Sequence, residues 1–329
     1  MRIGVHGRAM EAVDAPVLMR TIEQMTAFGL EPVLTKSLAT WLAEVGHPVP
    51  WTVLNDDELI RHRLALFVSL GGDGTLLDTV SLVGRSEIPI LGINLGRLGF
   101  LSNVRLDTVE KAMAAIRDGR YALQDRALVE VVDHPELLGA HNFALNEVSI
   151  HKQDSASMIA VHVHLADEFL NTYWADGLII ATPTGSTAYS LSCGGPVVFP
   201  TSDALVINPI CPHNLNVRPF VVPDHFTIRL QLEARTDRCL LNLDSRSVSV
   251  DGQSTHHHPT GQIRYENGAV RGLRLLGYPP EETQLGLGCA FQRSEGLNYL
   301  RAPKPRTNFG FTTFNDRCAG SSYSRSSCY

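Results

Sequence analysis

The sequence predicts an α/β domain with a parallel sheet, followed by a mostly antiparallel β domain. Strand-like and helix-like segments alternate over the first hundred residues, and short β-prone runs separated by Gly, Pro, Asp and Asn follow to about residue 276. The length of 329 residues suits about two domains of roughly 150 residues each. Apolar residues make up 44% and charged residues 19%, which excludes disordered, collagen-like and disulfide-rich classes.

The first domain is predicted from five segments in chain order. Arg2–Val5 is a short apolar strand ending before Gly7, and Val17–Gly29 carries apolar residues at helical spacing. Leu64–Leu70 is short, apolar and followed by glycines, as expected for a fully buried strand. Leu76–Val83 is predicted as a helix and Ile88–Ile93 as another buried strand. This β-α-β-α-β order favours a parallel sheet covered by helices.

The second domain is predicted from runs rich in β-branched and apolar residues. These runs are Leu128–Val132, Asn142–Ile150, Ile159–Leu165, Leu178–Thr182, Phe226–Glu233, Leu240–Leu243 and Ser247–Val250. We place the boundary within Ser102–Gln124, which includes one helix-like stretch, Val109–Arg117. The expected domains are therefore 1–120 and 121–276.

The segment 277–329 differs from both domains. Its last residues, Cys318–Tyr329, are rich in serine and contain no aliphatic residue larger than alanine. Clear periodicity is absent, so we expect the end of this tail to be disordered.

Charge and cysteine content limit the class of protein. The net charge is −6 and the pI about 6.1, which argues against a nucleic-acid-binding surface. No apolar stretch approaches the ~18 residues needed to cross a membrane, and the chain opens on a strand-like run, so we expect neither a membrane anchor nor a signal peptide. Six cysteines without a CxxC pair fit reduced thiols in the cytoplasm.

The strongest motif is Gly71-Gly72-Asp73-Gly74-Thr75, between a predicted strand and a predicted helix. Such a turn presents backbone N–H groups that attract phosphate, and its glycines let phosphates approach the backbone. Asp73 would repel phosphate, so we expect it to meet a hydroxyl group, a metal ion or both. A simple tight turn is the alternative.

A second glycine-rich segment, Gly92–Leu101, follows the next strand. Ligands of open parallel sheets gather outside the carboxyl ends of the strands, where Gly71–Thr75 would also lie. Arg97 is a candidate phosphate partner. The alternative is a connector that only packs against the second domain.

The densest polar stretch is Asp176–Pro196, in which a buried strand leads into a loop of hydroxyl and small residues. Such a loop suits ribose and base edges, and Tyr189 offers a stacking face. A Ser/Thr-capped helix start is the alternative. Two shorter polar segments, Asn146-Glu147 and Asp251–Gln253, suit ligand contacts only where other site residues lie beside them. The alternatives are an exposed strand end for the first and a plain β-turn for the second.

Three further patterns are weighed and set aside. The consecutive side chains of His256–His258 point in different directions and precede a proline, so a solvated turn is favoured over a metal site. Ser186 is not in a Gly-x-Ser-x-Gly elbow. The chain has no Walker A lysine motif.

Taken together, these blocks resemble the NAD kinase family of the bacterial type over residues 1–276. The blocks that carry the resemblance are Gly71–Leu77, Gly92–Leu101, Asn146-Glu147, Asp176–Pro196, Pro209–His213 with Arg218-Pro219, and Asp251–Gln253. The resemblance implies an N-terminal Rossmann-like domain, a C-terminal β domain and an active site in the crevice between them. From Glu281 onward the tail departs from the family's usual ending.

The resemblance also implies the reaction. Family members transfer a phosphoryl group from ATP, or in some members inorganic polyphosphate, to the 2′-hydroxyl of the adenosine ribose of NAD, using Mg²⁺ or another divalent metal. Asp73 would be the proton acceptor, and homodimers or homotetramers are expected. The implied site comprises Gly71, Gly72, Asp73, Gly74, Thr75, Asn146, Glu147, Asp176, Thr187, Ala188, Tyr189, Ser190, Leu191, Ser192 and Gln253.

Two other functions compete with this interpretation. A lipid or sphingoid kinase shares the Gly71–Thr75 turn, but we find no apolar acceptor channel or membrane-facing helix in the sequence. A dinucleotide sensor without turnover is the second, and Asp73 argues against it, because binding alone does not favour a carboxylate near phosphates.

Overall fold

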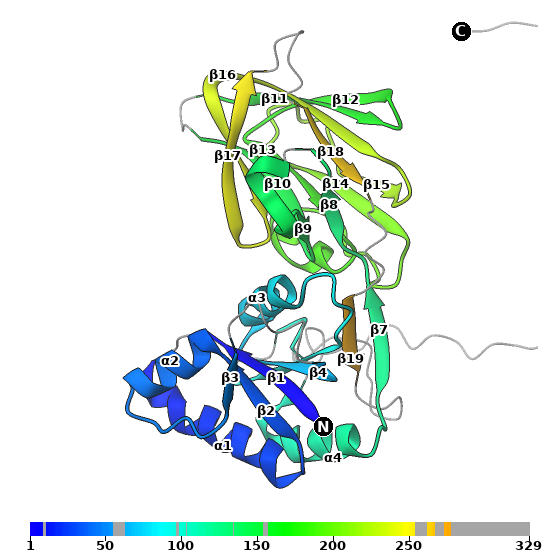
Figure 1. The fold of residues 1–329 in the computed structure, drawn as a ribbon. Helices are drawn as coiled ribbons and strands as arrows, with labels where there is room; N and C mark the ends of the chain where they lie inside the picture. The colour runs from blue at the N-terminus through cyan, green and yellow to red at the C-terminus, as the bar shows by residue number, and fades with distance from the viewer. Residues whose placement is uncertain are drawn as a thin grey trace, which may run out of the picture. The chain divides into compact units, whose positions relative to one another are not determined.

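The computed structural model describes residues 1–8, 11–54, 63–96, 99–102, 104–133, 135–153, 157–253, 262–266 and 273–277. These residues form two sheets, a mostly parallel one covered by helices and an antiparallel one (Figure 1). The tail beyond residue 277 and the histidine tract at 256–258 lie outside the described residues, as does Arg97.

The first sheet has the strand order β3-β2-β1-β4-β5-β19-β7, with β6 beside β5. Its strands are β1 (Arg2–Gly7), β2 (Glu31–Thr35), β3 (Thr52–Leu54), β4 (Leu66–Leu70), β5 (Ile90–Asn94), β6 (Val104–Arg105), β7 (Ala122–Arg126) and β19 (Leu273–Gly277). The strands from β1 to β6 pair in parallel, so the parallel sheet predicted from the sequence is confirmed.

The sheet reverses its direction of growth between β1 and β4. The chain adds β2 and β3 on one side of β1, and then adds β4 and β5 on the other side. The carboxyl ends of β1 and β4 lie side by side at this point, with Gly7 opposite Leu70. In open α/β sheets, a crevice for ligands forms at such a switch point.

Helices cover both faces of this sheet. They are α1 (Ala15–Ala27), α2 (Lys36–Glu44), α3 (Asp73–Val83) and α4 (Val109–Arg117). Apolar residues of α1, α2 and α4 share one buried cluster with Val68, whereas α3 packs in another with Phe67. Neighbouring residues of β4 thus face opposite layers. A right-handed crossover places its helix on one face when the next strand is added on one side of the sheet. It places the helix on the other face when the next strand is added on the other side.

The second sheet has the order β15-β14-β13-β10-β16-β18-β8-β9, and β11, β12 and β17 pair off this path. Its strands are β8 (Val129–Val131), β9 (Phe143–Ala144), β10 (Glu147–Lys152), β11 (Ile159–Leu165), β12 (Glu168–Ala175), β13 (Gly177–Ala181), β14 (Ala204–Ile210), β15 (Phe220–Pro223), β16 (Ile228–Leu243), β17 (Arg246–Gln253) and β18 (Gln262–Glu266). All of their pairings are antiparallel, as the sequence predicts.

The chain returns to the first sheet after completing the second. β19 pairs in parallel with β5 and antiparallel with β7. Strands on both sides of the expected boundary near residue 120 therefore belong to the first sheet. Among the described strands, β7 pairs with β19 alone, and β19 follows the β domain in the sequence.

One buried cluster contains residues from both parts of the chain. It includes Leu76 of α3 together with Phe143 of β9 and Leu145, which lies between β9 and β10 of the second sheet. Leu76 lies three residues after Asp73, and Leu145 immediately precedes Asn146. Within the described residues, no helix combines the length and apolar character needed to span a membrane.

Candidate active site

The glycine turn joins β4 to α3. The Gly71 amide donates to the carbonyl of Ile93 at 2.9 Å, which ties the turn to the neighbouring strand β5. Gly71 has a φ of 151°, and a Cβ there would lie 2.3 Å from Oγ1 of Thr75. Only glycine fits this position. Gly72 forms the N-cap, so Asp73 is the first residue of α3.

The carboxylate of Asp73 accepts three backbone hydrogen bonds from the loop after β5. Its donors are the amides of Phe100 at 2.8 Å, Leu101 at 3.1 Å and Ser102 at 3.2 Å. The loop approaches so closely that a Cβ on Gly99 would lie 2.2 Å from Oδ1 of Asp73. The two glycine-rich segments therefore meet at the carboxyl edge of the sheet, which confirms the expectation from the sequence.

A second aspartate holds the segment that contains Asn146 and Glu147. Asp244, in the hairpin turn between β16 and β17, accepts hydrogen bonds from the amides of Leu145 and Asn146, each at 2.8 Å, and of Glu147 at 3.2 Å. This arrangement fixes the backbone between β9 and β10. The sequence does not single out Asp244.

Glu147 is a largely buried carboxyl group whose Oε2 has no hydrogen-bond partner. Burial and then the nearby charge of Asp244 raise the pKa of Glu147 to about 8. Burial penalises the charged form, and a like charge adds to that penalty. Glu147 therefore carries a proton at neutral pH and can donate a hydrogen bond as well as accept one.

The loop after β13 is bonded directly to the same segment. Oγ1 of Thr182 donates to the carbonyl of Leu145 at 2.6 Å, and the Thr182 amide donates to the carbonyl of Asn146 at 2.9 Å. A Cβ on Gly185 would lie 2.0 Å from that Asn146 carbonyl oxygen. The polar stretch that begins after β13 thus packs against Asn146, as a shared site requires.

Tyr189 begins the short helix α6 (Tyr189–Ser192). Its ring stacks on His151 of β10 with centroids 5.8 Å apart and an interplanar angle of 18°. The Tyr189 side chain is still 39% exposed. The adjacent Lys152 forms an ion pair with Asp176 at 2.5 Å, so Asp176 lies beside the strand that supports Tyr189.

The remaining predicted residues divide into two groups. Thr187, Ala188, Ser190, Leu191 and Ser192 follow Thr182 in the same loop and helix, and Ser190 is buried against Asn208, whose Nδ2 donates to the Ser190 carbonyl at 2.8 Å. Gln253 stays a predicted contact. Its backbone pairs with Glu233 at the end of β17, and Val250, three residues before it, pairs with Cys239, which in turn pairs with Lys152 of β10.

Comparisons with known proteins agree on one family. Residues 34–121 match the model of the ATP-NAD kinase N-terminal domain, and residues 145–257 match that of the ATP-NAD kinase C-terminal domain. A NAD kinase of Cytophaga hutchinsonii is 41% identical over 253 residues, covering 76% of this chain and 86% of the relative. A NAD kinase of Flavobacterium psychrophilum is 39% identical, covering 77% and 87%. The chain belongs to the NAD kinase family.

Solved structures of similar fold include two from this family. Yeast NADH kinase complexed with NADH superposes with a TM-score of 0.74 at 24% identity, covering 91% of this chain and 90% of that one. An NAD kinase from Archaeoglobus fulgidus in complex with ATP gives 0.64 at 25% identity, covering 85% and 94%. The Rossmann-like domain and the C-terminal β domain expected from the resemblance to the NAD kinase family are therefore both confirmed.

Two parts of the site are not predicted from the sequence. Asp244 gives no motif in a single sequence and lies 97 to 99 positions from the amides that donate to it. Phe100 and Leu101, at the end of the predicted segment Gly92–Leu101, act through their backbone amides, which no side-chain pattern reveals. The signal for the loop is Gly99, whose lack of a side chain admits Asp73. Within the described residues, no group of three or more His, Cys, Asp or Glu side chains could hold a metal ion.

Proposed function

We propose that this member of the NAD kinase family transfers a phosphoryl group from ATP to the 2′-hydroxyl of the adenosine ribose of NAD, forming NADP. The observation that carries the proposal is the Asp73 carboxylate, which three backbone amides hold at the start of α3 beside the glycine turn. This position, at the carboxyl ends of β4 and β5, is where ligands of such sheets bind.

Asp73 is the proposed proton acceptor. Phosphoryl transfer depends on the position of the reacting groups and on neutralising the phosphate charge more than on covalent chemistry. Because three amides fix its carboxylate, Asp73 can direct the hydroxyl group of the acceptor with little loss of its own conformational freedom. The amides of the glycine turn are the proposed contacts of the donor phosphates.

The second sheet is the proposed dinucleotide pocket. Asn146 and Glu147 offer an amide and a protonated carboxyl group for ribose hydroxyls, and Tyr189 offers a ring whose other face is supported by His151. Asp176, Gly74 and the residues Thr187 to Ser192 complete the proposed contacts. Gln253, at the end of β17, is also a proposed contact.

The test is NADP formation by the purified full chain with NAD, ATP and Mg²⁺. Asp73→Asn should lower kcat by about 10²–10⁴, the usual value of a general base, while NAD binding measured by calorimetry largely survives. Exposed Asp107→Asn is the matched control and should retain activity. Near-normal turnover by Asp73→Asn would contradict the assignment, and NAD binding without any turnover in the wild type would indicate a sensor.

The identity of the phosphoryl donor and that of the metal ion are also part of the proposal. Inorganic polyphosphate in place of ATP tests the donor. The described residues provide no ready-made metal site, and the carboxylates of Asp73 and Asp78 already accept hydrogen bonds. A divalent cation would therefore be held mainly by the donor phosphates and water, as Mg²⁺ often is. Titration of activity with Mg²⁺ and Mn²⁺ checks this.

A homo-oligomer in the cytoplasm is also proposed. Phe169 and Trp174 of β12 are 61% and 46% exposed, and among the described strands β12 pairs with β11 alone. An exposed apolar edge strand favours association. Light scattering coupled to gel filtration should show a dimer or tetramer, and Trp174→Lys should shift it towards the monomer.

A further inference from the structure

Arg8 lies at the switch point of the first sheet, directly after β1. Gly7 pairs with Leu70, so Arg8 follows the carboxyl end of β1 where Gly71 follows the carboxyl end of β4. A cation at this crevice faces the place where an anionic ligand of an open α/β sheet binds. None of the motifs recognised in the sequence includes Arg8.

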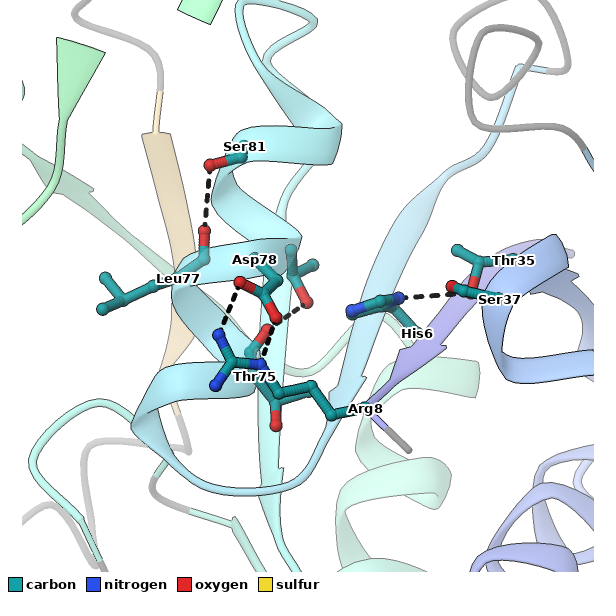
Figure 2. Close-up of polar contacts among 9 residues, drawn as sticks. His6, Arg8, Thr35, Ser37, Thr75, Leu77, Asp78 and Ser81 are labelled. Carbon is teal, nitrogen blue, oxygen red and sulfur yellow. Dashed lines mark hydrogen bonds and ion pairs between the residues drawn. The ribbon is translucent and has the colours of Figure 1, made fainter. Parts of the chain in front are cut away.

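Asp78 fixes the orientation of the Arg8 guanidinium. Figure 2 shows Arg8 reaching to Asp78 on α3, with Nε and Nη2 both bonded to the carboxylate; the Nη2–Oδ1 distance is 2.8 Å. A two-point ion pair of this kind holds the plane of the guanidinium. Asp78 lies one and a half turns after Asp73 on the same helix.

The remaining nitrogen of Arg8 faces the glycine turn. Nη1 takes no part in the ion pair with Asp78, and it lies 3.1 Å from where a Cβ on Gly74 would be. The guanidinium is about half exposed. One charged donor therefore points at the backbone of the turn, within reach of a ligand seated there.

We propose that Arg8 binds the phosphate chain of the phosphoryl donor through Nη1, with Asp78 as the positioning residue that aims it. This inference rests on the proposed function. It adds a charged side chain to a donor site that otherwise consists of backbone amides. Arg8 offsets the charge of a chain of linked phosphates, which ATP and inorganic polyphosphate share.

Inorganic tripolyphosphate is the direct probe, with binding measured by calorimetry on the full chain. Arg8→Gln should weaken binding by about 10- to 100-fold, the usual value of a charge-assisted hydrogen bond. Arg8→Lys should recover part of this loss. Arg2→Gln is the matched control, because Arg2 forms an exposed ion pair with Glu31 at the opposite end of the same strand, and it should bind as the wild type does.

Kinetics then separate this role from a structural one. Arg8→Gln should raise KM for ATP, and for polyphosphate where it is used, while KM for NAD stays unchanged; Asp78→Asn should do the same more weakly. Wild-type affinity for tripolyphosphate in Arg8→Gln, or equal loss for NAD and donor, would overturn the inference. Arg8-dependent tripolyphosphate binding without phosphorylation of NAD by the wild type would support the phosphate site and refute the proposed function.

Discussion

The carboxylate of Asp73 and the backbone amide of Phe100 are joined by a 2.8 Å hydrogen bond. This bond connects the first residue of α3 to the loop after β5, and two further amides of the loop share the carboxylate. The conformation of the loop and the orientation of Asp73 are therefore a single structural unit, so a change in either is transmitted to the other.

Gly99→Ala tests this coupling without touching Asp73 itself. The new methyl group would lie 2.2 Å from Oδ1 of Asp73, so the loop must move and its amide bonds must lengthen. We expect a stability loss of about 1–3 kcal/mol, measured by urea unfolding, and a marked fall in kcat. Gly96→Ala has open space around its Cβ and should leave both unchanged; equal effects of the two variants would refute the coupling.

Glu147→Gln should change how stability depends on pH. The folded protein holds the Glu147 proton up to about pH 8, because burial and Asp244 raise its pKa, whereas the unfolded chain releases it near pH 4.5. The contribution of Glu147 to stability is thus fully present below pH 4.5 and is lost as the pH rises through 8. At pH 9, Glu147→Gln should be more stable than the wild type by at least about 1.4 kcal/mol, the value of one pKa unit.

Thermal unfolding between pH 4.5 and 9 measures this difference. The gain of Glu147→Gln should shrink towards zero at the acid end. Exposed Glu168→Gln serves as the control and should follow the wild type throughout. Parallel curves for the wild type and Glu147→Gln would show that Glu147 titrates normally.

Asp244→Ala removes the acceptor for the amides of Leu145, Asn146 and Glu147. Unpaired amides at the buried residues Leu145 and Asn146 should cost about 1–3 kcal/mol of stability, and the loosened backbone should raise KM for NAD more than KM for ATP. Asp244→Asn keeps an acceptor oxygen but removes the charge that faces Glu147. We therefore expect a smaller stability loss and a Glu147 titration below pH 8, read from the same unfolding curves.

Much of the fold follows from local patterns. Val109–Arg117 matches α4 and Ile159–Leu165 matches β11 at both ends, because one face of each element is apolar at a clear period. The predicted runs Phe226–Glu233 and Leu240–Leu243 instead fall in one strand, β16, which begins at Ile228. The polar residues between them hide its continuity, which pairing with β11, β10 and β17 maintains.

The residues of the candidate site also differ in how well local sequence patterns reveal them. Motifs locate Asp73, Asn146 and Tyr189, since each lies in a dense block of chemically informative residues. Asp244 lies in a hairpin turn and Arg8 directly follows β1, and each bonds to residues about 70 to 100 positions away, which no local pattern records. Gln253, in the Asp-Gly-Gln block, stays a prediction, because strand register gives only its backbone pairing with Glu233 at the end of β17.

The return of β19 to the first sheet has a consequence for synthesis of the protein. On the ribosome, β7 is complete 147 residues (273 − 126) and β5 179 residues (273 − 94) before β19, the strand that pairs with both of them, begins. Until then they present open hydrogen-bonding edges, which invite pairing with other nascent chains. A chain that ends before residue 273 lacks the partner strand of β5 and β7, so we expect it to aggregate where the full chain does not, as light scattering of the two purified chains would show.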